Sequence, residues 1–205
     1  MINGNFRHQD SSGNEGYLTD GGVQWMTAGK GVVHSEMPEQ KEGLVRGFQL
    51  WLNLPKSKKM IDPYYHDIQA KEIPVVNIDG GIVKVISGEF GGVSGPGKPH
   101  TGVKYLDVQK KGKGIFSLPI EELWNSFIYV YEGAIRSGLL IEKGSLGILS
   151  ANDIFECEVV EENTKFLLIS GEPIREPVAR GGPFVMNTRA EIMQAFEDYQ
   201  SGKLN

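Results

Sequence analysis

Short segments of β-favouring residues, separated at regular intervals by turn residues, are the feature that most limits how this chain can fold. From residue 82 onward, eight such segments follow one another, and the chain's 27 glycines provide many of the turn positions. The segments are residues 82–86, 103–108, 114–118, 126–131, 134–141, 146–149, 155–160 and 165–170. This regular spacing is typical of an antiparallel sandwich or barrel, so we expect an all-β fold.

The first part of the chain shows the same alternation of short strands and turns. We expect extended segments at residues 5–9, 17–18, 23–26 and 32–36, and a longer strand within residues 44–54. In the longer segment, alternate aliphatic and aromatic residues share one face, and Gln49, Trp51 and Asn53 share the other. This pattern fits a barrel wall whose interior holds a site, and equally a sandwich strand with Trp51 at the surface.

The connection between the two parts is rich in proline, lysine and aspartate. It covers residues 55–74, and we expect one helical turn in it near residues 67–71. We place the domain boundary near residue 72, which gives predicted domains of residues 1–71 and 72–205.

One long helix is predicted, at residues 189–200. Thr188 and Glu191 have the spacing of a capping box, in which each side chain binds a free backbone N–H at the helix start. The helix also carries an apolar stripe, which is more typical of packing than of a cofactor site. The stripe consists of Ile192, Ala195, Phe196 and Tyr199.

Composition excludes several classes of function. The net charge is −5 and the one basic cluster is short, so we expect no direct nucleic-acid partner. No apolar run is long enough to span a membrane, and no signal peptide opens the chain. The single cysteine, Cys157, rules out an internal disulfide framework and favours a reducing compartment. We therefore expect a cytoplasmic protein.

The pair His34 and Glu36 is the strongest indication of chemistry. Residues two apart on a strand point to the same face, so an extended segment at residues 32–36 directs the imidazole and the carboxylate the same way. A neutral imidazole beside a carboxylate is a common half of a transition-metal site. With 18 glutamates and four histidines in the chain, a chance His-x-Glu is common, and the same pair is equally consistent with an ordinary salt bridge.

One motif resembles a phosphate-binding loop but lacks its chemistry. Residues 92–98 have the glycine and lysine spacing, whereas Pro99 stands where a serine or threonine would bind magnesium. The residues that follow favour a strand rather than a helix. We expect no nucleotide site there.

The beginning of the chain resembles an internal segment. Residues 1–7 and residues 130–136 share an apolar strand, a turn glycine, a second strand and an arginine. If the two are duplicates, about 55 to 60 residues of the first copy do not occur in this sequence. We therefore expect a first domain that lacks its N-terminal part.

Several longer runs resemble the pirin family. They are residues 22–38, from Gly22-Val-Gln-Trp to His34-Ser-Glu-Met-Pro38, then residues 47–55, 171–177 and 182–188. The resemblance covers essentially the whole chain. It implies two cupin domains, each a jelly-roll β-barrel, the first N-terminally truncated here, with a C-terminal α-helix and one metal site in the first domain.

The resemblance also implies an activity and a set of ligands. Pirins hold iron(II) or another divalent transition metal through three histidines and one glutamate, and several resemble quercetin 2,3-dioxygenases. His34 and Glu36 match the third and fourth ligands, and Glu36 could also accept a proton. The first two ligands belong to a His-x-His-Arg-Gly motif that this sequence does not contain. We therefore expect weak metal binding and impaired ring opening of a flavonol-like substrate.

The other histidines and the pocket residues complete these expectations. His8 belongs to the nearest predicted strand, and it either faces the site or is an ordinary strand residue, which we expect. We expect His66 and His100 to be exposed to solvent. Gln49, Trp51 and Met26 are expected to line the pocket or to serve in packing.

A second reading is a non-catalytic bicupin that acts in interaction or regulation, because one eukaryotic pirin is a transcriptional co-regulator. In a partly open barrel, exposed sheet edges would then favour self-association.

Overall fold

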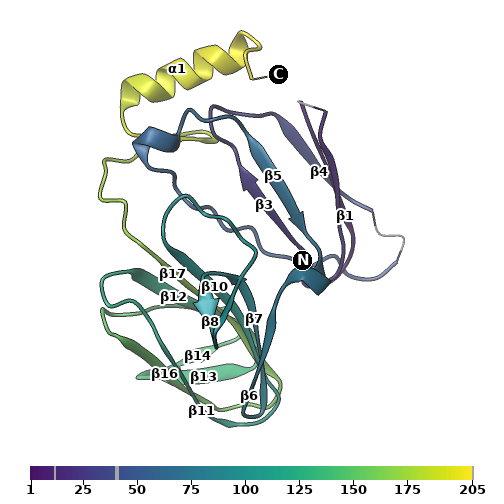
Figure 1. Ribbon diagram of the computed structural model, residues 1–205, viewed down its shortest axis with the longest axis vertical. Helices are drawn as coiled ribbons and strands as arrows, with labels where there is room; N and C mark the ends of the chain where they lie inside the picture. Colours follow the sequence, from purple (N-terminus) through teal and green to yellow (C-terminus); the bar gives the residue numbers. More distant parts are fainter. Residues whose placement is uncertain (12, 40–41, 205) are drawn as a thin grey trace. The chain divides into compact units, whose positions relative to one another are not determined.

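The computed structural model describes residues 1–11, 13–39 and 42–204. The chain divides into two compact units, and both are built mainly of β-strands (Figure 1). Unit 1 contains Met1–Glu72 together with the chain from Ile174 onward, and unit 2 contains Ile73–Pro173. The all-β prediction is therefore confirmed. Among the described residues, no helix combines the length and the apolar character needed to cross a membrane.

Unit 2 contains two antiparallel sheets. Six strands form one sheet in the order β15-β12-β17-β10-β7-β6, and four strands form the other in the order β11-β16-β13-β14. A two-stranded ribbon, β8-β9, lies between β7 and β10 in sequence. The strands are β6 (Val75–Ile78), β7 (Gly81–Ser87), β8 (Glu89–Phe90), β9 (Val93–Ser94), β10 (Val103–Lys110), β11 (Gly114–Pro119), β12 (Asn125–Glu132), β13 (Ala134–Ser137), β14 (Leu139–Glu142), β15 (Leu146–Ile148), β16 (Ile154–Val159) and β17 (Thr164–Gly171).

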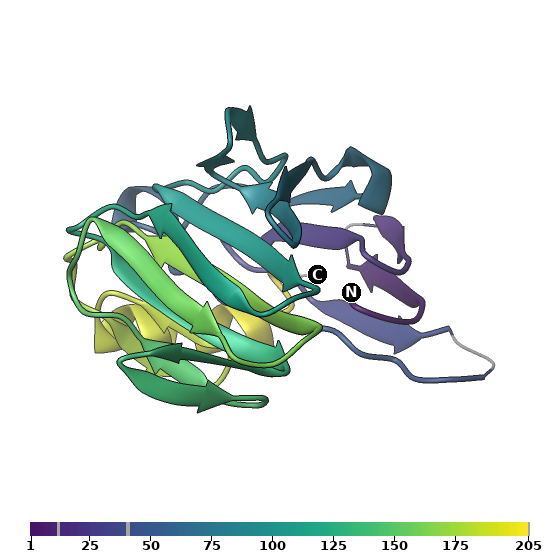
Figure 2. The same ribbon diagram turned by 90° about the horizontal axis from the view of Figure 1, so that it is seen from below.

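The alternating sequence pattern explains how the two sheets enclose a core. Along β16, Phe155, Cys157 and Val159 are buried, whereas the residues between them are exposed. The strands of unit 2 can be followed in Figure 2. Residues from both sheets meet in one apolar cluster, in which the ring centroid of Phe166 lies 5.7 Å from that of Phe116. Each such side chain contributes about 1.5–3 kcal/mol when it leaves water, so this cluster stabilises unit 2.

The motif at residues 92–98 has no phosphate-loop geometry. Val93 and Ser94 form the short strand β9, and the next element is the strand β10. The expectation that no helix follows the motif is confirmed.

Unit 1 contains small sheets. One has the order β2-β1-β4, and the others are the pairs β3-β5 and β18-β19. Its elements are β1 (Phe6–Asp10), β2 (Glu15–Leu18), β3 (Val23–Thr27), β4 (His34–Pro38), the short 3-10 helices η1 (Lys56–Lys58) and η2 (Ala70–Glu72), β5 (Tyr64–Ile68), β18 (Ala179–Gly181), β19 (Phe184–Met186) and α1 (Arg189–Gln200). The sheet β2-β1-β4 carries the residues expected at the metal site.

The terminal helix α1 begins and ends where the sequence predicts. Thr188 and Glu191 form the capping box, with the Thr188 hydroxyl accepting from the Glu191 N–H. Its apolar stripe serves in packing, because the ring of Phe196 meets that of Phe184 at 5.1 Å. Ile192, the buried residue of α1, lies beside Gly181, where an added Cβ would come within 2.6 Å of it.

The C-terminal segment lies in unit 1, which differs from the predicted domain of residues 72–205. Two hydrogen bonds join it to the segment before β5. The Lys59 ammonium donates to the carbonyl of Val185 at 2.9 Å, and the Lys56 N–H donates to the Glu176 carboxylate at 2.7 Å. In the structure the first change of unit follows Glu72, and the return of the chain to unit 1 at Ile174 has no signal in local sequence.

The strand predicted within residues 44–54 is wrong. Arg46 forms one isolated bridge with Asn3, and the structure assigns no strand from Gly47 to Pro55. A strand needs a hydrogen-bonded neighbour as well as an alternating pattern, and none pairs with this segment in the described chain. Trp51 is consequently 60% exposed, and its indole N–H points to the Gln49 side chain at 3.4 Å.

The turn between β3 and β4 depends on Gly29. Its φ of +53° is left-handed, and a Cβ there would lie 2.1 Å from the carbonyl oxygen of Ile61. The Lys30 N–H donates to that carbonyl at 2.8 Å. This close backbone approach joins the turn to the segment before β5 and sets where β4 can begin.

We expect Gly29→Ala to lower the free energy of unfolding by about 3 kcal/mol, because left-handed strain and a backbone clash add together. Gly13→Ala is the matched control, since Gly13 also has a positive φ of +82° but has no atom within 4 Å of an added Cβ. It should cost about 1 kcal/mol. Urea unfolding followed by circular dichroism measures both, and equal losses would contradict the role of the Ile61 contact.

Candidate metal centre

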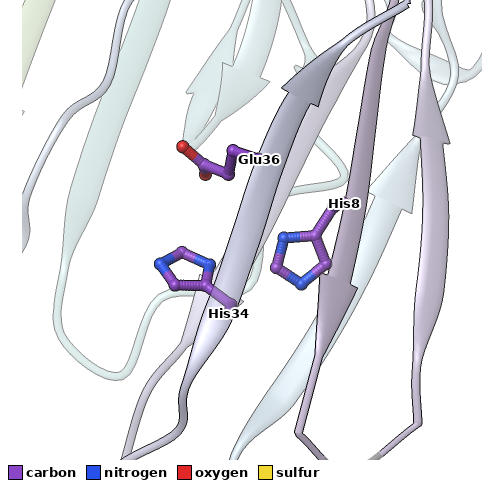
Figure 3. A group of neighbouring side chains, drawn as sticks. All are labelled: His8, His34 and Glu36. Atoms are coloured by element: carbon purple, nitrogen blue, oxygen red, sulfur yellow. The ribbon is translucent and has the colours of Figure 1, made fainter.

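Strand β4 presents His34 and Glu36 on one face. They are two residues apart in a continuous strand, so their side chains project to the same side (Figure 3). His34 is half-buried and Glu36 is exposed. The arrangement predicted for these two residues is therefore present in the structure.

The neighbouring strand β1 adds His8 to this pair. β1 and β4 are antiparallel, and their register places His8 directly opposite Glu36 and Asp10 directly opposite His34. Directly opposite residues in an antiparallel pair point to the same face, so His8 shares the face of His34 and Glu36. Figure 3 shows His8 coming from the strand next to the one that carries the other two.

The three side chains lie within reach of one ion. One ligand atom from each of His8, His34 and Glu36 can be chosen so that all three lie within 4.8 Å of one another. Donors that share an ion at about 2.1 Å in a facial set, about 90° apart, lie about 3.0 Å from one another, so these atoms must approach by up to about 1.8 Å to hold one ion. Side-chain rotation can close a gap of this size, especially at the exposed Glu36.

His8 forms the buried end of the cluster. It is 3% exposed, and neither of its ring nitrogens has a hydrogen-bond partner among the described residues. Its ring lies 4.6 Å from that of Tyr65 and 5.1 Å from that of His34. Burial, and secondarily the neighbouring His34, lower the pKa of His8, which favours the neutral imidazole that a metal ion requires.

Carboxylates surround the buried imidazole. Glu36, Asp10 and Asp67 each act to raise the pKa of His8, although desolvation has the larger effect. The Asp67 carboxylate lies over Gly16, where an added Cβ would come within 2.0 Å of its Oδ2 atom. The Gln24 side-chain amide donates to Asp67 at 3.0 Å and holds it in place. This negative environment favours a cation near His8.

The residues fit a divalent transition metal. Two imidazoles and one carboxylate are the donor types of the facial set that binds non-haem iron(II), and they leave positions open for water or substrate. The orphaned nitrogens of the buried His8, and the buried Nδ1 of His34, are unexplained without a further partner. Within the described residues, unit 2 contributes no comparable group of His, Cys, Asp or Glu.

The structure places His8 beside His34 and Glu36, which is the position that the sequence left open but did not favour. The physical reason is the register of β1 against β4, which a local pattern does not define. No local signal was available, because β2 and β3 lie between β1 and β4 along the chain.

The other predicted residues have mixed outcomes. His66 is half-buried rather than exposed, and its Nδ1 is buried, whereas His100 is exposed as predicted. Gln49 and Trp51 are exposed and do not join the cluster. Met26 lies directly opposite Tyr65 in the β3-β5 pair, so it shares the face that meets His8.

Comparison with known proteins agrees with this architecture. The pirin family model matches residues 1–52, and the model of the pirin C-terminal cupin domain matches residues 105–205. A pirin-like protein of Caulobacter vibrioides is 45% identical over 207 residues, which cover 99% of this chain and 75% of that protein. Human pirin is 40% identical over 206 residues, which cover 98% of this chain and 71% of pirin.

A solved structure provides the same result at the level of the fold. Quercetin 2,3-dioxygenase from Acinetobacter baumannii superposes with a TM-score of 0.91 at 36% identity, covering 100% of this chain and 74% of that protein. The predicted all-β fold of two cupin domains is thereby confirmed. With relatives of this identity along nearly its whole length, the chain belongs to the pirin family.

Proposed function

We propose that unit 1 binds a divalent transition metal, iron(II) in the cell, through His34 and Glu36. The observation that carries the proposal is that both side chains project from one face of β4, at a place where Glu36 is open to solvent. A metal ion bound there would supply a Lewis acid and a redox centre. The similar Acinetobacter baumannii protein, a quercetin 2,3-dioxygenase, supports oxygen-dependent ring opening of a flavonol-like substrate as the reaction class.

Each residue has a separate part in this proposal. Glu36 is the most exposed of the three, so it can accept the proton of an enol hydroxyl as well as serve as a ligand. His34 holds the ion on the same face. The Tyr65 ring covers His8 and limits the access of water from the buried side.

The donor set also limits the activity. The sequence contains no His-x-His, so the chain offers fewer protein donors than the family pattern implies. Fewer donors bind an ion more weakly and leave more of its positions to water. We therefore propose that the chain turns over a flavonol-like substrate more slowly than a centre with four protein ligands would. We also propose a cytoplasmic protein without nucleic-acid or membrane partners.

His34→Ala should weaken metal binding by at least about tenfold, because it removes a direct ligand. Isothermal titration of the metal-free protein with Co(II), and anaerobic titration with Fe(II), measure the affinity. His100→Ala is the matched control, since His100 is an exposed histidine in unit 2. Equal affinities for the parent and for His34→Ala, or no binding to the parent, would refute the proposed site.

Glu36→Gln distinguishes the two proposed roles of the Glu36 carboxylate, metal ligand and proton acceptor. If Glu36 accepts a proton, quercetin turnover, followed as the loss of flavonol absorbance, should fall by more than the loss of bound metal accounts for. Turnover that stays proportional to bound metal would show that Glu36 acts as a ligand alone.

The exposed apolar residues of unit 2 favour self-association as a second candidate function. β14 and β15 each end a sheet, and they carry Leu139 at 78% and Ile148 at 84% exposure. A surface hollow of about 510 Å³ lies beside β15 and is lined in part by Leu123, Trp124 and Leu146. Edge strands with exposed apolar side chains are sites where a second copy of a chain can pair.

We expect light scattering after gel filtration to show a molecular mass that rises with protein concentration. Ile148→Lys should raise the concentration at which half of the protein is associated by at least about tenfold, because the contact would bury a charge. Met60→Lys is the control, since Met60 is 62% exposed but belongs to unit 1. A monomer at every concentration would exclude this candidate.

A further inference from the structure

We propose that His8 is a third metal ligand, which completes a two-histidine, one-carboxylate set with His34 and Glu36. The inference rests on the proposed metal site at β4 and adds a residue from another strand. It makes the site a property of the β1-β4 pair rather than of a single strand.

The burial of His8 requires an explanation. The His8 side chain is 3% exposed, and neither ring nitrogen has a hydrogen-bond partner among the described residues. Burying it in this way lowers the stability of the folded state, because both nitrogens give up hydrogen bonds to water without a replacement. Packing against Tyr65 does not need those nitrogens, since an apolar ring would pack there without this loss. A metal ion is a partner that accounts for a polar ring at this position.

The surrounding strands restrict where His8 can point. β1 lies between β2 and β4, and its backbone pairs with both of them. On the face opposite His8, the Arg7 guanidinium contacts Glu15 on β2 at 2.7 Å and Glu39, just beyond β4, at 3.2 Å. The two-sided backbone pairing places the alternate residue His8 on the face that carries Glu36, and these exposed ion pairs are compatible with that register.

Distance and charge both favour a shared ion. The three ligand atoms lie within 4.8 Å of one another, and a facial set around an ion at about 2.1 Å from each would need them to approach by up to about 1.8 Å, which side-chain rotation can supply. Glu36 lies directly opposite His8 across the strand pair. Asp10 and Asp67 add negative charge around the imidazole without belonging to the set of three.

The test compares Zn(II) and Co(II) binding to the metal-free full chain by isothermal titration. His8→Gln and His34→Gln should each weaken binding by at least about tenfold, because each removes one of three ligands. His66→Gln is the matched control, since His66 is a half-buried histidine of unit 1 outside the cluster. Unchanged affinity in His8→Gln, together with the loss in His34→Gln, would overturn the inference and leave the β4 site in place.

A second measurement uses the unaltered chain, because His8→Gln could fail to fold. X-ray absorption of the Zn(II)-loaded parent counts the imidazoles that scatter around the metal. Two imidazoles support His8 as a ligand, provided that His66→Gln and His100→Ala leave the spectrum unchanged. One imidazole overturns the inference, and the absence of metal binding by the parent overturns it together with the proposed function.

Discussion

The antiparallel register between β1 and β4 is the constraint on which the candidate site depends. It places His8 opposite Glu36, and it places the ion-paired Arg7 on the other face of the same strand. Because side chains alternate along a strand, a slip of one residue would exchange these two and remove His8 from the site. The site is therefore as well defined as the pairing of two short strands, and the Gly29 turn before β4 contributes to that pairing by setting where β4 can start.

Local patterns predicted those elements whose determinants are local. The helix α1 was predicted with its correct ends because Thr188 and Glu191 supply its capping box within four residues. The β-favouring segment at residues 155–160 likewise predicted β16, in which Phe155 and Cys157 are buried on one face. His34 and Glu36 belong to the same category, because a strand brings residues two apart to one face.

Contacts between distant segments could not be predicted in this way. The segment within residues 44–54 has an excellent alternating pattern but no partner strand in the described chain, so Trp51 is exposed. The return of α1 to unit 1 depends on contacts such as Lys59 with Val185, which are more than 100 residues apart. His8 and Glu36 are brought together by register in the same manner. The half of the site that lies on one strand was predictable, and the half that depends on pairing was not.

The gradient of exposure across the site relates its structure to its chemistry. His8 is buried, His34 is half-buried and Glu36 is exposed, so the three side chains extend from the interior of unit 1 to its surface. A buried neutral imidazole supplies a ligand without competing for protons, whereas an exposed carboxylate can exchange protons with a substrate. Burial of all three would exclude a large aromatic substrate, and exposure of all three would give a weak, fully hydrated ion. With a metal ion in the proposed site, this order would give one buried ligand that anchors the ion and one exposed ligand that could exchange protons with a bound molecule.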